Sequence, residues 1–571
     1  MSTPASDQPR LLFDLRVPMR DGVTLSADVT FPPGHAEGRK YPAILQRTPY
    51  LKAQQPVYDA GRYWASKGYA FVAMDVRGRG DSEGEWVPYR NDGRDGYDAI
   101  EWIAAQPWCS GNVGTLGASY PGRIQWLTAL QQPPHLKAMV VLVTPSDPFV
   151  ETPTGVPSPM HISWEHYTSG RVLQPTEAVN WSAVHEHLPL LTMDEAVGRS
   201  LPGWREQVRH AQLDEYWEPL RYQHAFEHVS VPVLHISGWY DDEQIGTPLN
   251  FAGMVARGAP EVRDKQRLLM GPWGHQVNTA QKIGEQDFGP QALIDLRGEE
   301  LRWFDFWLKG DEDSHTGAPV RLFVMGENVW RDEREWPLAR TSWTPFYLAS
   351  AGRANSRFGD GALVSNIVGA SGGRPPAEGS ALATPDTYAY DPARPVPFIT
   401  DAAFNQIGGP DDYAAVLRRD DVLVYATQPL ERPVEVTGPV TATLYAASSA
   451  PDTDFTAMLL DLHPNGLALR LCDGMARARF REGMAHPTLI EPGQVYRYEI
   501  DCWNTSRLFA AGHRIALAVS SSAFPKYDRN PNTGAPLGTT TELAVAQQTI
   551  LHDAEHPSAV VLPIIPREQE G

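Results

Sequence analysis

The sequence has few cysteines, no long apolar run and no basic segment. Its three cysteines, Cys109, Cys472 and Cys502, are too few and too scattered for a disulfide framework or a zinc site. No window approaches about 18 continuous apolar residues, the length of a membrane span. The first residues, MSTPASDQPR, have neither the basic start nor the apolar core of a secretion signal. We therefore expect a cytoplasmic protein with no membrane partner.

The charge balance is acidic. Asp and Glu number 69 against 49 Lys and Arg, which gives a formal net charge of -20. A nucleic-acid-binding protein needs a basic surface to neutralise phosphates, and no Lys/Arg-rich run appears. Nucleic acid is thus excluded as a partner, while the acidity by itself indicates only solubility.

The chain length and the apolar pattern predict several domains. A chain of 571 residues exceeds what one hydrophobic core serves. Short apolar runs such as YPAILQ (41–46) and YAFVAMDV (69–76) alternate with helical patterns such as DGYDAIEWIAAQ (95–106), in which Ile100 and Ile103 share a face with Ala104. Strands that alternate with helices predict a parallel sheet covered on both faces, which is an α/β fold.

Two changes in composition and in the apolar pattern mark domain boundaries. Residues 146–229 are rich in Trp, His, Tyr and Pro and lose the strand–helix alternation, which resumes at VPVLHISGWYDD (231–242), so we expect an inserted subdomain. After about residue 345 the segments alternate apolar and polar residues and contain an Asn465-Gly466 hairpin signal. The sequence therefore predicts an antiparallel β-sandwich, with a linker near 340–352.

The segment GTLGASYPGR (114–123) places Ser119 between a strand-like run and a helical pattern. A serine on such a sharp strand–turn–helix junction is typical of a nucleophile elbow. Pro121 stands where the standard motif has its second glycine, but proline is tolerated in a first helical turn, and Gly122 can provide the close packing. The alternative is a structural Gly/Ser turn.

A serine nucleophile requires a base and a group that orients the base. In doubly wound hydrolases these follow in the order acid, then histidine. Asp241 follows the strand-like VPVLHISG, 122 residues after Ser119, and His275 follows RLLMG, 34 residues further. Both positions lie at strand C-terminal ends, where such sites assemble. The alternatives are that Asp241 only begins an acidic helix start with Asp242 and Glu243, and that His275 is structural.

Several longer motifs carry a family resemblance. The segments DVRGRGDSEGEW, WCSGNVGTLGASYPG, SGWYDD, GPWGH, VRLFVMGENVWRDEREWPL and SSSAFPKYDRNPNTG resemble those of the cocaine esterase group of serine hydrolases, the CocE/NonD family. This family is allied to α-amino acid ester hydrolases and X-Pro dipeptidyl-peptidases. The resemblance extends from about residue 12 to 566, and the family signature GxSYxG fits Gly117, Ser119, Tyr120 and Gly122.

The resemblance implies roles for individual residues. Ser119 would be the nucleophile, His275 the general base and acid, and Asp241 the group that orients the imidazole. The Tyr50 hydroxyl and the backbone N–H of Tyr120 would form the oxyanion hole. Without the family, Tyr50 is an ordinary turn tyrosine. No metal or organic cofactor is implied.

The resemblance also implies the architecture. An α/β-hydrolase core would comprise residues 1–145 and 230–345, a helical cap residues 146–229, and a jelly-roll-like β-sandwich residues 346–571. Relatives that dimerise suggest a homodimer, and the sequence leaves the oligomeric state open.

Aromatic residues around the insertion are candidates for a substrate pocket between domains, where ligand sites concentrate. Aromatic walls suit an ester or amide substrate with an aryl or bulky hydrophobic acyl group. The competing explanation for each residue is packing of the cap on the core. The candidates are Trp164, Tyr167, Trp181, Trp239, Tyr240 and Phe404.

Other activities stay open. α-Amino acid ester hydrolases bind the substrate ammonium through a carboxylate cluster, of which Glu243 matches one member, but Gln244 stands where a further acid is expected. X-Pro dipeptidyl-peptidase activity is a second alternative, weakened by the absence of an extra N-terminal module that some such enzymes have. A non-catalytic carbohydrate-binding protein is the alternative of a different class.

Overall fold

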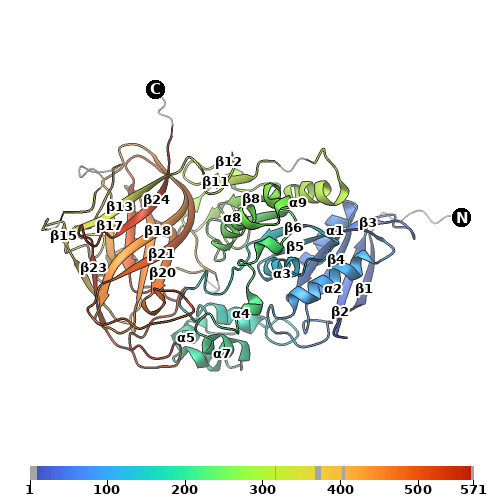
Figure 1. Ribbon diagram of the computed structural model, residues 1–571, viewed down its shortest axis with the longest axis horizontal. Coiled ribbons are helices and arrows are strands. Elements are labelled where there is room, and N and C mark those ends of the chain that lie inside the picture. The colour runs from blue at the N-terminus through green and yellow to red at the C-terminus, as the bar shows by residue number, and fades with distance from the viewer. Residues whose placement is uncertain (1–8, 315–316, 367–373, 378, 402–405, 568–571) are drawn as a thin grey trace.

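The structure, a computed structural model, has three parts (Figure 1). An α/β core contains the N-terminal half of the chain, a helical cap is inserted into it, and a C-terminal β domain lies beside both. The residues described are 9–314, 317–366, 374–377, 379–401 and 406–567.

The core is built on one ten-stranded sheet with the order β1-β2-β4-β3-β5-β6-β7-β8-β11-β12. From β4 to β11 the paired neighbours are parallel, whereas β2 and β12 run antiparallel to their neighbours. Central strands such as AFVAMD in β4 are buried along their whole length, as expected for a parallel sheet covered on both faces. The strands are β1 (Arg10–Pro18), β2 (Thr24–Phe31), β3 (Tyr41–Thr48), β4 (Ala70–Asp75), β5 (Cys109–Ala118), β6 (Leu136–Leu142), β7 (Val233–Gly238), β8 (Arg267–Gly271), β11 (Val320–Val324) and β12 (Val329–Glu333).

Helices cover both faces of this sheet. The predicted apolar face of α2, with Ile100 and Ile103, packs in one cluster with α3 and α8, while α1 and α9 pack in another. Helix α9 begins at Leu296, where the Asp295 side chain caps it by accepting from Gly298 N. The core helices are α1 (Gln55–Ser66), α2 (Asp92–Ala104), α3 (Tyr120–Ala129), α8 (Gly246–Arg257) and α9 (Leu296–Phe304), which continues as a π-helical turn, Asp305–Lys309.

The insertion folds into short helices around its own small core. Trp181 and Trp204 lie in this core, and Phe480 and Leu537 of the C-terminal β domain pack against it. The cap therefore packs against the C-terminal β domain, and it lies at the bottom of the molecule in Figure 1. Its helices are α4 (His161–Tyr167), α5 (Trp181–Glu186), α6 (Met193–Val197) and α7 (Pro202–Arg209), with single 3-10 turns at Leu190–Thr192, Glu218–Leu220 and Phe226–His228.

The C-terminal β domain begins at β13, which pairs with β24 near the C-terminus. This strand occupies most of the range predicted as linker, so the domain starts a few residues earlier than residue 346. The Asn465-Gly466 hairpin connects β19 to β20, with Gly466 at φ 93. The strands are β13 (Ser342–Ala351), β14 (Ala362–Val364), β15 (Ala383–Thr384), β16 (Asp386–Tyr390), β17 (Leu423–Ala426), β18 (Val434–Ser448), β19 (Asp454–Leu462), β20 (Ala468–Arg477), β21 (Tyr496–Phe509), β22 (Arg514–Ser520), β23 (Ala546–Leu551) and β24 (Ala559–Ile565).

The two large domains are joined directly. Met325, at the end of β11, forms a bridge with Arg507 of β21, and Gln244 Nε2 donates to the Asn504 carbonyl. The three cysteines are buried and form no disulfide with one another. None of the helices in the described ranges is long and apolar enough to cross a membrane.

Candidate active site

Ser119 lies on the sharp turn between β5 and α3. Its backbone has φ 63 and ψ -127, a conformation that non-glycine residues rarely adopt and that clusters at functional sites. The turn is tight: a Cβ at Gly117 would lie 2.6 Å from Pro121, and one at Gly122 would lie 2.4 Å from Thr144 Oγ1. Gly122 thus provides the close packing that the standard motif assigns to the position of Pro121.

The Tyr120 amide lies directly after this serine, at the start of α3. The first amides of a helix have no intrahelical partner, and no acceptor for this amide occurs among the described residues. The Tyr120 side chain is anchored elsewhere: its hydroxyl donates to Asp92 Oδ2 (2.6 Å) and accepts from Trp86 Nε1 (3.2 Å). Only the backbone of Tyr120 is available to a ligand at Ser119.

Tyr50 follows β3 and approaches the same serine. The indole of Trp164, on α4 of the cap, donates to the Tyr50 hydroxyl oxygen at 3.0 Å. Burial raises the pKa of Tyr50, while its hydrogen bonds with Trp164 and Ser119 and the charge of His275 oppose this shift. The phenol therefore stays protonated, and its oxygen accepts from Trp164 while the hydroxyl lies within hydrogen-bonding reach of Ser119.

His275 and Asp241 form a hydrogen-bonded pair at the ends of β8 and β7. Asp241 is fully buried; its Oδ1 lies 2.8 Å from His275 Nδ1, and its Oδ2 accepts from Ser237 Oγ at 2.7 Å. A carboxylate at Nδ1 selects the tautomer in which that nitrogen carries the hydrogen, leaving Nε2 as the proton acceptor.

Asp242, which sequence reasoning noted only as a helix-start acid, also contacts this imidazole. Its Oδ1 lies 3.0 Å from His275 Nδ1. Burial lowers the pKa of His275, but the charges of Asp242 and Asp241 outweigh burial and raise that pKa well above its usual range. Burial raises the pKa of Asp241.

These groups meet in a cavity of about 1280 Å³ between the three parts of the molecule. Ser119, Tyr50 and His275 contribute from the core. The cap and the C-terminal β domain supply the opposite walls. Residues on those walls include His161, Trp164, Tyr167, Trp503, Lys526 and Tyr527.

The predicted pocket residues divide between this cavity and the protein interior. Trp164 and Tyr167 line the cavity. Trp239 and Tyr240 do not: both are buried in an apolar cluster beside β8 and β11, where the Trp239 indole donates to the Phe323 carbonyl at 2.8 Å. Packing at the junction of the domains thus accounts for these two. Trp181 lies in the core of the cap, and Phe404 lies outside the described residues.

Comparisons with known proteins show the family to which the chain belongs. Residues 21–277 match the X-Pro dipeptidyl-peptidase (S15 family) model, and residues 315–561 match the X-Pro dipeptidyl-peptidase C-terminal non-catalytic domain. The chain is 38% identical to the cocaine esterase of Rhodococcus sp. (strain MB1 Bresler) over 97% of its own length and 98% of the relative. It belongs to the CocE/NonD family of serine hydrolases. It is thus an enzyme of the carboxylic ester hydrolase type, with dipeptidyl-peptidase activity as the alternative.

Solved structures agree on the fold. An aminopeptidase from a marine sediment archaeon, Thaumarchaeota archaeon, superimposes with a TM-score of 0.84 at 24% identity, covering 99% of this chain and 98% of that one. An α-amino acid ester hydrolase does so with a TM-score of 0.82 at 24% identity and the same coverage. At this identity the likeness shows the fold of this CocE/NonD chain and nothing more.

Two glutamates also line the cavity. Glu151 and Glu243 both line it, and Glu151 Oε1 accepts from Ser146 N at 2.7 Å. Burial raises the pKa of Glu151 to about 7, and burial together with the charge of Glu151 raises the pKa of Glu243 well above its usual range. Sequence reasoning missed Glu151, because no motif surrounds it and only the fold brings it to Glu243.

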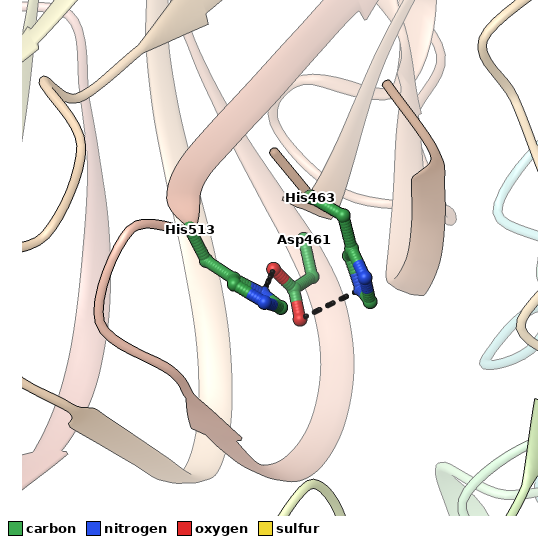
Figure 2. A group of neighbouring side chains, drawn as sticks. All are labelled: Asp461, His463 and His513. Carbon is green, nitrogen blue, oxygen red and sulfur yellow. Dashed lines mark hydrogen bonds and ion pairs between the residues drawn. The ribbon is translucent and has the colours of Figure 1, made fainter. Parts of the chain in front are cut away.

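Two groups of side chains have metal-ligand chemistry within the described ranges. One is Asp241, Asp242 and His275 beside the cavity; the other is Asp461, His463 and His513 in the C-terminal β domain (Figure 2). In the second group Asp461 Oδ2 already accepts from Arg507 at 2.7 Å, and Oδ1 lies 2.7 Å from His513 Nδ1. A guanidinium on the carboxylate disfavours a cation there. These contacts describe a structural anchor of two hairpin turns.

Proposed function

We propose that the chain hydrolyses carboxylic esters through a triad of Ser119, His275 and Asp241 and an acyl-enzyme intermediate. The observation that carries the proposal is the strained turn that holds Ser119 beside Tyr50 and the free Tyr120 amide. The same cavity receives His275, whose Nδ1 is held by Asp241. A nucleophile, a base with an orienting acid and two donors are the parts that acyl transfer requires.

Each residue then has a defined step. His275 Nε2 takes the proton of Ser119 Oγ as this oxygen bonds the acyl carbon. The Tyr50 hydroxyl and the Tyr120 amide hold the negative charge on the former carbonyl oxygen. His275 returns the proton to the leaving alcohol as the carbon–oxygen bond breaks. Water attacks the acyl-enzyme with His275 again as base, which releases the acid and restores Ser119.

The cavity walls support an aryl or bulky hydrophobic acyl group. Trp164 and Tyr167 line the cavity, and the Tyr167 ring lies 6.2 Å from that of Tyr50. The cocaine esterase relative bears a name that fits such a substrate class. We therefore propose aromatic or bulky acyl esters before small aliphatic ones.

A second candidate is an ester of an α-amino acid. Glu151 and Glu243 share the cavity, and each has a raised pKa, so a bound ammonium would relieve the cost of holding two buried carboxylates together. A carboxylate cluster that binds an ammonium needs a second acid, and this chain has Gln244 where that acid is expected. Glu151 provides a second carboxylate from another part of the chain. X-Pro amides form the third class to test, because the family models bear that activity in their names.

The test of the chemistry is labelling of Ser119. A fluorophosphonate probe and a 4-nitrophenyl ester should label and acylate the wild-type chain, and Ser119→Ala should abolish both while keeping the wild-type melting temperature. Full hydrolysis by Ser119→Ala would overturn the proposal. A folded wild-type chain with no labelling and no turnover would instead favour a non-catalytic carbohydrate-binding role.

The test of the substrate is a panel of aryl, alkyl and α-amino esters with X-Pro amides. If the amine is recognised, Glu243→Gln and Glu151→Gln should raise KM about tenfold for α-amino esters, and much less for the matched esters without the amine. Equal effects on both ester classes would remove the glutamates from substrate recognition.

A further inference from the structure

We propose that Asp242 is a second hydrogen-bond acceptor for the His275 imidazole. In this role Asp242 positions His275 and sets the pH range in which His275 acts as a base. The inference rests on the proposed function. In this chain two successive carboxylates, Asp241 and Asp242, meet one nitrogen of His275. A triad needs only one of them.

His275 Nδ1 carries one hydrogen but faces two carboxylate oxygens, one from Asp241 and one from Asp242. Nδ1 lies 2.8 Å from Asp241 Oδ1, with which it forms the hydrogen bond, and 3.0 Å from Asp242 Oδ1, which it meets as an ion pair. A small rotation of the imidazole is enough to exchange the two acceptors. Asp242 is thus placed to hold the same tautomer when Asp241 cannot.

The Asp242 oxygen has no other donor. Its Oδ1 is buried and accepts no hydrogen bond of normal geometry from any residue that the structure describes, although the side chain as a whole is 26% exposed to the cavity. The imidazole is the cationic group at ion-pair distance from it among the described residues. A buried carboxylate oxygen without donors is stabilised chiefly when that ring is protonated.

Glu243 and Tyr50 also interact electrostatically with His275. Glu243 lies in the same loop as the aspartates, and Tyr50 comes from the loop after β3. Burial raises the pKa of Glu243 well above its usual range and also raises the pKa of Tyr50, which favours the uncharged form of both groups. Asp241 and Asp242 therefore dominate the charge at His275, in agreement with its raised pKa.

Two consequences follow for catalysis. Only neutral His275 can accept the Ser119 proton, so two carboxylates that favour the imidazolium move the rising limb of kcat/KM to higher pH. Asp242 also limits the damage from loss of Asp241. An Asp→Asn change at the orienting acid of a triad costs about 10⁴-fold in kcat when no other group keeps the tautomer.

The experiment compares pH profiles of kcat/KM for one 4-nitrophenyl ester. For Asp242→Asn we expect the midpoint of the rising limb to fall by about one pH unit or more, with a modestly lower alkaline plateau, because a weaker base is left. Asp264→Asn, an exposed aspartate outside the cavity, is the matched control and should overlay the wild type.

The double variant tests whether Asp242 replaces Asp241 as the acceptor of the His275 Nδ1 hydrogen. We expect Asp241→Asn to lose about 10² to 10³-fold, and Asp241→Asn with Asp242→Asn to reach the full loss of about 10⁴-fold. Thermal melting shows whether each variant folds, and NMR titration of the His275 ring, assigned with His275→Gln, gives its pKa without activity. The His275 titration should move to lower pH in Asp242→Asn.

Three results would overturn the inference: an Asp242→Asn profile that overlays the wild type, an unmoved His275 titration, or a double variant no worse than Asp241→Asn. Each of these is compatible with a labelled Ser119 and an inactive Ser119→Ala, which would leave the proposed function intact. Full activity of Ser119→Ala would instead refute the proposed function itself.

Discussion

Two clusters in this chain consist of aspartate and histidine side chains but differ in their composition and surroundings. In the cavity, His275 meets Asp241 and Asp242; in the C-terminal β domain, Asp461 meets His463 and His513 (Figure 2). The first has two carboxylates for one imidazole. The second has two imidazoles for one carboxylate, and a guanidinium besides.

The surroundings decide what each cluster can do. No arginine or lysine pairs with Asp241 or Asp242 among the described residues, so the imidazole is their counter-charge. Asp461 is paired with Arg507, which is itself nearly buried. Burial raises the pKa of Asp461, but its bonds to His463 and His513 and the charge of Arg507 outweigh burial and hold that pKa well below its usual range. Of these two clusters, the one with two carboxylates for its imidazole shares a cavity with Ser119, and the proposed catalytic role belongs to that cluster.

The sharpest way to test the comparison is to remove one histidine from each cluster. His275→Gln should lower kcat by about 10⁴-fold or more, because Ser119 then has no base. His513→Gln should leave kcat within about twofold, since His513 touches no part of the cavity. Steady-state kinetics on the same ester measures both. A large loss of kcat in folded His513→Gln would erase the distinction between the clusters.

Removing the shared carboxylate of the second cluster should affect stability. Asp461→Asn leaves the Arg507 guanidinium buried and unpaired, at a cost of about 3–5 kcal/mol in the free energy of unfolding. The folded-state pKa of Asp461 is depressed, so its contribution is present above the unfolded pKa and is lost as the pH falls towards the folded value. Urea unfolding at pH 7 measures the loss; an unchanged midpoint would show that the anchor contributes little.

A smaller effect is expected from Tyr50, the proposed oxyanion donor. Tyr50→Phe removes one hydroxyl beside Ser119 and should lower kcat by about 10 to 10³-fold, with the melting temperature kept. Tyr58→Phe, on the exposed side of α1, removes a hydroxyl outside the cavity and is the control. An unchanged kcat for Tyr50→Phe would remove Tyr50 from the oxyanion site.

The fold class was predictable because it depends on periodicity and on long motifs. Buried parallel strands such as β4 appear in the sequence as continuous apolar runs, and the family segments extend over nearly the whole chain. The start of the C-terminal β domain was placed a few residues late, because β13 alternates poorly: SWTPFYLASA has a proline and two adjacent aromatic residues that do not suggest a strand.

The places of the candidate site residues in the fold were predictable where the chain has a clear local pattern. Ser119 needs glycines around a strained turn, and Asp241 and His275 follow apolar strands, so each leaves a trace in the sequence. Trp239 and Tyr240 were expected in the pocket because aromatic residues look alike whether they pack or bind. Glu151 and the contact of Asp242 with His275 arise only from tertiary structure.

The most direct measurement of the central claim is rapid-quench mass spectrometry of the enzyme with a slowly deacylating 4-nitrophenyl ester. We predict a mass increase equal to one acyl group, located by peptide mapping on Ser119, formed at the rate of the 4-nitrophenol burst and absent in His275→Gln. Turnover without any covalent adduct, or an adduct on a residue other than Ser119, would contradict the account.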